Sequence, residues 1–193
     1  YEKSMTAPGF TIMRPERRTY FATSEMAYLI AKMGAYSKVI APSHELHIGD
    51  VSRKSGGPLG SHKSHENGMD ADIAFYFKAD KEMSTFANAL KSNRPIGDWM
   101  MPQQWKLFKY AVSSKYVDMI FIHPTLKQAL CRYAVSSGEL KAGQKSGDAF
   151  ETLRRLWPDT GHDDHFHLRI KRTCAKGQKG CIPSPELPLK SGC

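Results

Sequence analysis

The sequence predicts an α+β fold with a central, mainly antiparallel sheet flanked by helices and long loops. Helix-like and strand-like segments are mixed along the chain, without the regular strand–helix–strand alternation of a parallel sheet. A length of 193 residues, with 40% hydrophobic and 24% charged residues, suits one domain with a sizeable core. We therefore expect residues 1–193 to form a single domain, with an N-terminal arm at about 1–21 and a tail at about 173–193.

The predicted helices have apolar residues at helical spacing or residues typical of helix ends. Thr23 or Ser24 could cap the first helix and Gly34 could end it, while Pro124 suits the first position of a later one. We expect helices at Ser24–Met33, Lys81–Lys91, Pro102–Val112, Pro124–Tyr133 and Asp148–Trp157.

Alternating or apolar runs between these segments predict the strands. They are expected at His44–Val51, Ile73–Phe77, Val117–Ile122 and in the segment Gly161–Arg169. Loops are expected at Ser52–Gly60 and Asn93–Asp98, and a turn at Pro158–Gly161 leads into the last strand.

The segment Gly161–Arg169 contains three of the eight histidines, at 162, 165 and 167. Successive side chains of a strand point to opposite faces, so His165 and His167 share one face while Phe166 and Leu168 can enter a core. Two imidazoles on one face of a strand are what a sheet contributes to a metal site.

A second segment supplies further ligands. His65 is followed by Gly68, which lets the backbone turn, and by Asp72 just before the predicted strand. His65, Asp72 and His167 give three protein ligands, as at catalytic zinc sites, whereas structural zinc is usually closed by four ligands rich in cysteine. Asp70 shares a face with Asp72, and we expect it to hydrogen-bond loop backbone.

The pattern His65-x-x-Gly68-x-x-x-Asp72 followed by His165-x-His167 resembles the zinc metallopeptidase superfamily of lysostaphin-type enzymes, D-Ala-D-Ala peptidases and the hedgehog domain. With Gly49-Asp50-Val51-Ser52, Gly56-Gly57 and His162-Asp163-Asp164-His165-Phe166-His167, it is specifically similar to the penicillin-insensitive murein endopeptidases. The resemblance runs from about Ile48 to Cys181. It implies a hedgehog/D-Ala-D-Ala-peptidase-like fold and one zinc ion.

The resemblance also implies roles for individual residues. His167 is expected to be a ligand, and His165 the general base or the group that stabilises the oxyanion. A histidine at the position of His62 can also reach the metal in this family, and His162 is expected to line the cleft. Asp163 and Asp164 are candidate partners that fix an imidazole tautomer; the alternative for these two, and for His62 and His162, is a solvated loop position.

Bound to such a site, zinc lowers the pKa of its water from about 15.7 to about 7. Three functions remain open. The first is hydrolysis of D-Ala–meso-diaminopimelate cross-links of peptidoglycan, with L,D links as further substrates. The second is a D,D-carboxypeptidase that removes terminal D-Ala. The third is a non-catalytic zinc domain that binds wall polymer or a protein, which the presence of His165 disfavours.

Four cysteines, at 131, 174, 181 and 193, allow three pairings. Cys174 and Cys181 bracket a polar loop that a short disulfide could close, which leaves Cys131 with Cys193 to tether the tail, and the resembling family carries disulfides after its His-x-His motif. Disulfides indicate an oxidising compartment, whereas four reduced thiols would indicate the cytosol.

The net charge of +9 predicts attraction to polyanions. No nucleic-acid-binding signature is evident, whereas anionic cell-wall polymer fits both the charge and the metal motif. No apolar run approaches the ~20 residues of a membrane span. No signal peptide is visible in a chain that opens on Tyr1, and we expect a periplasmic or secreted protein with peptidoglycan as its partner.

Overall fold

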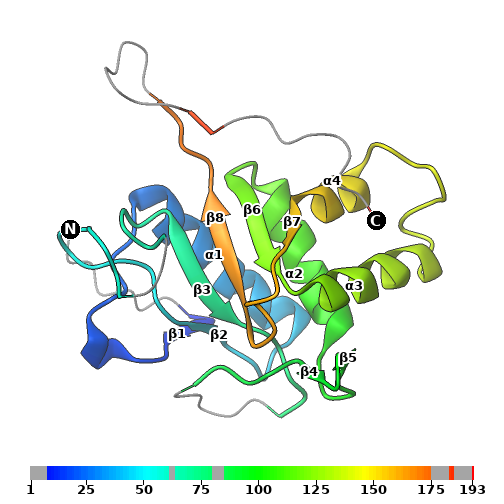
Figure 1. Cartoon of the computed structure of the whole chain (residues 1–193), viewed down its shortest axis with the longest axis horizontal. Helices are drawn as coiled ribbons and strands as arrows, with labels where there is room; N and C mark the ends of the chain where they lie inside the picture. Colours follow the sequence, from blue (N-terminus) through cyan, green and yellow to red (C-terminus); the bar gives the residue numbers. More distant parts are fainter. Residues whose placement is uncertain (1–7, 61–63, 80–84, 175–182, 185–192) are drawn as a thin grey trace.

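The computed structural model describes residues 8–60, 64–79, 85–174, 183–184 and 193. Its centre is a mixed six-stranded sheet in the order β1-β2-β3-β8-β6-β7, with helices packed against one face (Figure 1). The strands are β1 Phe10–Ile12, β2 Leu46–Ile48, β3 Asp70–Ala74, β6 Val117–Ile122, β7 Leu156–Pro158 and β8 His165–Ile170. The pairs β2–β3, β3–β8 and β8–β6 are antiparallel, and β1–β2 and β6–β7 are parallel. The predicted α+β fold with a mainly antiparallel sheet is confirmed.

The helices are α1 Ser24–Ile40, α2 Met101–Ser113, α3 Pro124–Ser136 and α4 Asp148–Arg155, with a short 3-10 helix at Pro15–Arg17. The covered face of the sheet carries the apolar side chains of alternate residues. Phe166 of β8 is fully buried, and its ring meets Phe108 of α2 edge-on at 4.9 Å between centroids. The opposite face of β3 and β8 carries the polar side chains of the candidate site.

Several predicted boundaries are wrong for identifiable reasons. Gly34 does not end the first helix but lies inside α1, where the chain at Gly9 crosses the helix. A Cβ on Gly34 would lie 3.1 Å from the backbone of Gly9. The glycine therefore permits a close crossing and the helix runs on to Ile40. Of the two candidate N-caps, Thr23 and Ser24, the structure uses Thr23, whose hydroxyl accepts from the backbone N–H of Met26 over 3.3 Å.

The predicted helix Lys81–Lys91 is also wrong in its described part. Residues 80–84 lie outside the described part of the chain, residues 85–89 are not helical, and Leu90–Lys91 forms strand β4. Strand β4 pairs with β5, Arg94–Pro95, inside the predicted loop. The last predicted helix ends at Arg155, because Leu156–Pro158 pairs with β6 as a strand. Within the described residues, no helix has the length and apolar character needed to span a bilayer.

Candidate metal centre

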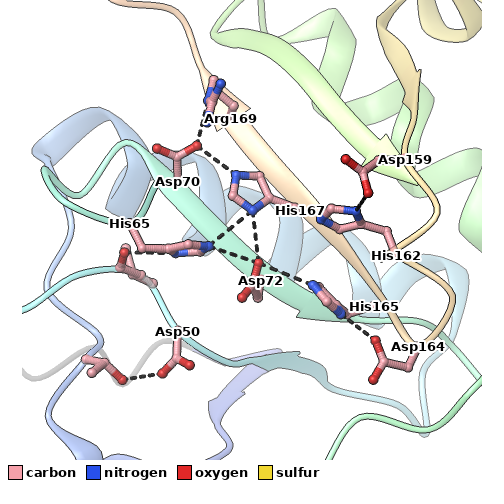
Figure 2. Close-up of polar contacts among 12 residues, drawn as sticks. Asp50, His65, Asp70, Asp72, Asp159, His162, Asp164, His165, His167 and Arg169 are labelled. Carbon is pink, nitrogen blue, oxygen red and sulfur yellow. Dashed lines mark hydrogen bonds and ion pairs between the residues drawn. The ribbon is translucent and has the colours of Figure 1, made fainter. Parts of the chain in front are cut away.

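The register of β3 against β8 brings the candidate ligands together. Asp72 lies opposite His167, with the pair Ala74–His165 on one side and the pair Asp70–Arg169 on the other. Because these residues are two apart along their strands, their side chains share the face of the sheet that the helices leave uncovered. Figure 2 shows Asp70, Asp72, His165, His167 and Arg169 on this face.

His65 reaches the same point from the loop before β3. Its backbone has φ +68°, a left-handed conformation that is rare for residues other than glycine. The imidazole is fully buried, and its Nδ1 donates to the carbonyl of Val51 over 3.0 Å. Because the proton of the neutral ring is then on Nδ1, Nε2 carries a lone pair, and this lone pair faces Asp72. Gly68 has φ +75°, and a Cβ there would lie 2.9 Å from the backbone nitrogen of Thr23, which confirms the tight turn predicted for it.

The segment Gly49–Val51 supports this arrangement, a role that the sequence did not reveal. The backbone N–H of Gly49 donates to the carbonyl of Asp72 over 2.8 Å, and the backbone N–H of Asp72 donates to the carbonyl of Asp50 over 2.9 Å. The buried carboxylate of Asp50 accepts from the Thr19 hydroxyl at 2.5 Å and pairs with Arg17 at 2.9 Å. The carbonyl of Val51 that orients His65 is therefore held in place.

Three donor atoms converge: Nε2 of His65, Oδ1 of Asp72 and Nδ1 of His167. Each of the three separations is 3.1 Å. Ligand atoms at about 2.0–2.1 Å from a tetrahedral zinc ion are roughly 3.3–3.4 Å apart, so the triangle has nearly the size of one face of such a tetrahedron. All three residues are buried, and within the described part of the chain they form the group able to hold a metal.

The Asp72 carboxylate shows why this triangle suits a cation. Its Oδ1 is buried and makes no hydrogen bond of good geometry with the described residues, although two imidazole nitrogens lie 3.1 Å away. Burial, the largest effect, raises the pKa of this carboxyl, but contacts with His165, His167 and His65 outweigh it and hold the pKa well below its usual value. The donor set of two imidazoles and one carboxylate therefore fits a divalent zinc ion.

His167 is oriented by a second carboxylate. Its Nε2 donates to Oδ1 of Asp70 over 2.7 Å, and the same oxygen accepts from Nε of Arg169 over 2.7 Å (Figure 2). Asp70 thus bonds side chains, and the prediction that it bonds loop backbone was wrong. Burial, the largest effect, lowers the pKa of the His167 imidazole, but the carboxylates of Asp70 and Asp72 outweigh it and raise that pKa.

His165 lies beside the triangle. Its Nε2 is 3.5 Å from Oδ1 of Asp72 and its Nδ1 is 2.5 Å from Oδ1 of Asp164. Burial, the largest effect, lowers the pKa of this imidazole, but the carboxylates of Asp164 and Asp72 outweigh it and raise the pKa to about 9. The ring of Phe86, which the sequence did not single out, stacks on it at 4.6 Å between centroids.

The other described candidates are His162 and Asp163. The His162 ring centroid lies 5.0 Å from that of His165 and 5.8 Å from that of His167, and its Nδ1 is 3.0 Å from Oδ1 of Asp159. Burial lowers the pKa of the His162 imidazole, and His165 adds to this effect. Asp163 accepts instead from Asn88, at 2.7 Å.

The remaining predictions concern His62 and the cysteines. His62 lies outside the described residues. Cys131 and Cys193 form a disulfide, as expected, with 5.6 Å between their Cα atoms. Cys174 is disulfide-bonded too, and Cys181, its expected partner, lies outside the described residues.

Comparison with known proteins agrees with this geometry. The chain is 28% identical over 206 residues to a penicillin-insensitive murein endopeptidase of Klebsiella pneumoniae subsp. pneumoniae, covering 98% of the chain and 67% of that protein. It is 29% identical over 195 residues to one of Escherichia coli O17:K52:H18, covering 95% of the chain and 65% of that protein. The chain thus spans about two thirds of the length of these curated relatives. The sequence model of the same family matches residues 2–193, and with nearly every residue covered, the chain belongs to the penicillin-insensitive murein endopeptidases.

Proposed function

We propose that this chain is a zinc-dependent murein endopeptidase that hydrolyses D-Ala–meso-diaminopimelate cross-links of peptidoglycan. The observation that carries the proposal is the triangle of His65, Asp72 and His167, with His165 next to it, in a chain of this family. We propose His65, Asp72 and His167 as the ligands of one zinc ion, and His62 as a further residue able to reach it. We also propose that residues 1–193 act as one domain and that the protein works outside the cytoplasm, which the family and the disulfides support.

When bound, zinc supplies a water of lowered pKa and polarises the scissile carbonyl. His165 is proposed as the catalytic partner. Its Nε2 faces the triangle and its Nδ1 is held by Asp164. The raised pKa favours a protonated imidazole, which is positioned to donate a hydrogen bond to the carbonyl oxygen as that oxygen gains charge; the alternative role, taking a proton from the attacking water, requires the neutral ring.

His162 is proposed to line the cleft. Its ring lies within 6 Å of the rings of His165, His167 and Phe121, and the dashed contact drawn for it in Figure 2 leads to Asp159 and not to a ligand atom. The Asp159 carboxylate fixes its orientation. It can therefore present a hydrogen-bonding edge to substrate without displacing a ligand.

Digestion of purified, cross-linked peptidoglycan tests the function. We expect conversion of cross-linked dimers to monomers, detected by mass spectrometry, with loss of that conversion in a chelator and recovery on addition of zinc. Release of terminal D-Ala alone would make the protein a carboxypeptidase. Absence of any cleavage with zinc bound would make it a binding domain.

A further inference from the structure

Arg14 connects the N-terminal part of the chain to the surroundings of His165. Strand β1 pairs in parallel with β2, and the backbone N–H of Met13 extends this pairing by donating to the carbonyl of Ile48 over 2.9 Å. Arg14 is the next residue, and its side chain therefore reaches Gly49, which directly follows β2. The proposed roles of the metal ligands and of His165 make no use of Arg14.

The guanidinium of Arg14 contacts an aromatic ring and a carboxylate at once. Its Cζ lies 5.5 Å from the centroid of the Phe86 ring, which is within the range of a cation–π contact. Its Nη2 lies 3.6 Å from Oδ2 of Asp50, a buried carboxylate. The Nε of Arg14 is buried and meets no hydrogen-bond acceptor in the described part of the chain. Because the side chain is only 24% exposed, its contacts with the ring and the carboxylate are partly shielded from water.

Phe86 in turn contacts His165. The two rings stack with 4.6 Å between their centroids and an interplanar angle of 17°. Phe86 is half-buried and lies in a segment, residues 85–89, that is neither helix nor strand. Regular secondary structure therefore does not fix the orientation of the Phe86 ring, and contacts of its side chain must do so.

Gly49 provides the space that the ring occupies. A Cβ at this position would lie 2.5 Å from Cζ of Phe86 and 3.4 Å from Nη2 of Arg14. Gly49 is not among the glycines with positive φ, so its backbone conformation is open to other residues. The feature of Gly49 that matters here is the absence of a side chain, which lets the ring and the guanidinium pack closely.

We propose that Arg14 is a positioning residue for His165. Its guanidinium, paired with Asp50, holds the Phe86 ring against the imidazole. This inference rests on the proposed catalytic role of His165 and adds to it a residue that lies outside both histidine motifs.

The test is a double-mutant cycle on kcat for cross-link cleavage, measured at saturating zinc. Arg14→Gln should lower kcat about 3- to 10-fold, the range of a partly buried cation–π contact, with KM and bound zinc little changed. In a Phe86→Leu background the same substitution should change kcat by less than about twofold, because the ring through which Arg14 acts is gone. Arg14→Lys keeps a cation at this position and should recover most of the loss.

Arg17→Gln is the matched control. Arg17 pairs with the same Asp50 carboxylate, at 2.9 Å, whereas it is the Arg14 guanidinium that lies over the Phe86 ring. We therefore expect Arg17→Gln to lower kcat much less than Arg14→Gln does. Equal losses in the two variants would place the effect at Asp50 and overturn the proposal. An equal effect of Arg14→Gln with and without the Phe86 ring would overturn it too.

The ring protons of His165 give a second readout that needs no substrate, because the ring current of the stacked Phe86 shifts their NMR resonances. These resonances should move in Arg14→Gln and in Gly49→Ala, whose added Cβ displaces the Phe86 ring, and should move far less in Arg17→Gln. Unchanged resonances and an unchanged kcat in Arg14→Gln would refute the positioning role and leave the endopeptidase function standing. A wild type that cleaves nothing with zinc bound would refute that function and, with it, this role.

Discussion

The Oδ1 atom of Asp70 lies 2.7 Å from Nε2 of His167 and accepts its hydrogen bond, so that Nδ1 of His167 faces Asp72 and His65. A carboxylate in this position orients the ring and makes the other nitrogen a better metal ligand. The pair thus belongs to the candidate metal centre, although Asp70 is not one of the three proposed ligands.

Replacing Asp70 should therefore weaken metal binding without removing a ligand. Asp70→Asn keeps an acceptor but loses the charge, and we expect zinc affinity to fall about 10- to 100-fold in competition with a chelator. Asp159→Asn is the matched control, because Asp159 contacts His162, which is not one of the three ligands. Equal zinc affinity of Asp70→Asn and the wild type would show that this contact does not tune the site.

Phe86 should position His165. Its ring stacks on the imidazole at an interplanar angle of 17° and is packed so tightly on Gly49 that a Cβ there would lie 2.5 Å from Cζ of Phe86. We expect Phe86→Leu to lower kcat by about tenfold with KM and zinc content little changed, since small displacements of a catalytic group are costly. Phe86→Tyr, which keeps the stacked ring, should retain most of kcat. A Phe86→Leu variant with wild-type kcat would exclude a positioning role.

The disulfide between Cys131 and Cys193 should stabilise the fold. It closes a loop with a sequence separation of 62 residues, for which the chain-entropy estimate is about 4 kcal/mol. We expect the double variant Cys131→Ser/Cys193→Ser to lose about 2–4 kcal/mol of unfolding free energy in denaturant titrations, with zinc content unchanged. Added reductant should lower the stability of the wild type toward that of the variant; a variant as stable as the oxidised wild type would contradict this prediction.

Glu151 of α4 should contribute a pH-dependent increment of stability. It pairs with Arg154 and with the buried Arg155, each at 2.8 Å. Burial raises the pKa of the Glu151 carboxyl, but these arginines outweigh it and lower that pKa. A lowered folded-state pKa gives stability that is present above the unfolded pKa of about 4.3 and is lost as the pH falls through the folded value.

The measurement for Glu151 is thermal unfolding of the wild type and Glu151→Gln between pH 7 and pH 3. We expect the variant to be less stable by about 0.5–1 kcal/mol at pH 7, since the pair is partly exposed, and the difference to shrink below pH 4. Glu16→Gln, at an exposed carboxylate, controls for the change in net charge. A stability difference that is constant over this range would exclude a charge effect.

The sequence was informative where local pattern decides the structure. Alternation along His165–Ile170 predicted which side chains share a face, and the register of β3 against β8 then places Asp72 opposite His167 as that pattern requires. The apolar run Val117–Ile122 forms strand β6 with the predicted bounds. Residues 101–113 and 124–136 form helices within a few residues of their predicted ends.

The rest depends on contacts between segments distant in the sequence, which no local pattern contains. Gly34 looks like a helix end, but the crossing of Gly9 makes it an interior glycine. Phe86 carries no motif, and only its stacking on His165 shows that it belongs to the site. The role of Asp70 could have been inferred, because it shares a face with Asp72 and the strand opposite carries a histidine ligand.

The central claim is that the triangle of His65, Asp72 and His167 holds the metal and that His165 acts beside it. The most direct test measures bound zinc per chain and the rate of cross-link cleavage together in His167→Ala and His165→Ala, with His65→Ala as a second ligand variant. We expect the two ligand variants to lose both zinc and cleavage. His165→Ala should keep zinc and lose about 100-fold or more in rate, the usual contribution of a general acid–base group. Full zinc occupancy in either ligand variant, or wild-type cleavage by His165→Ala, would contradict the account.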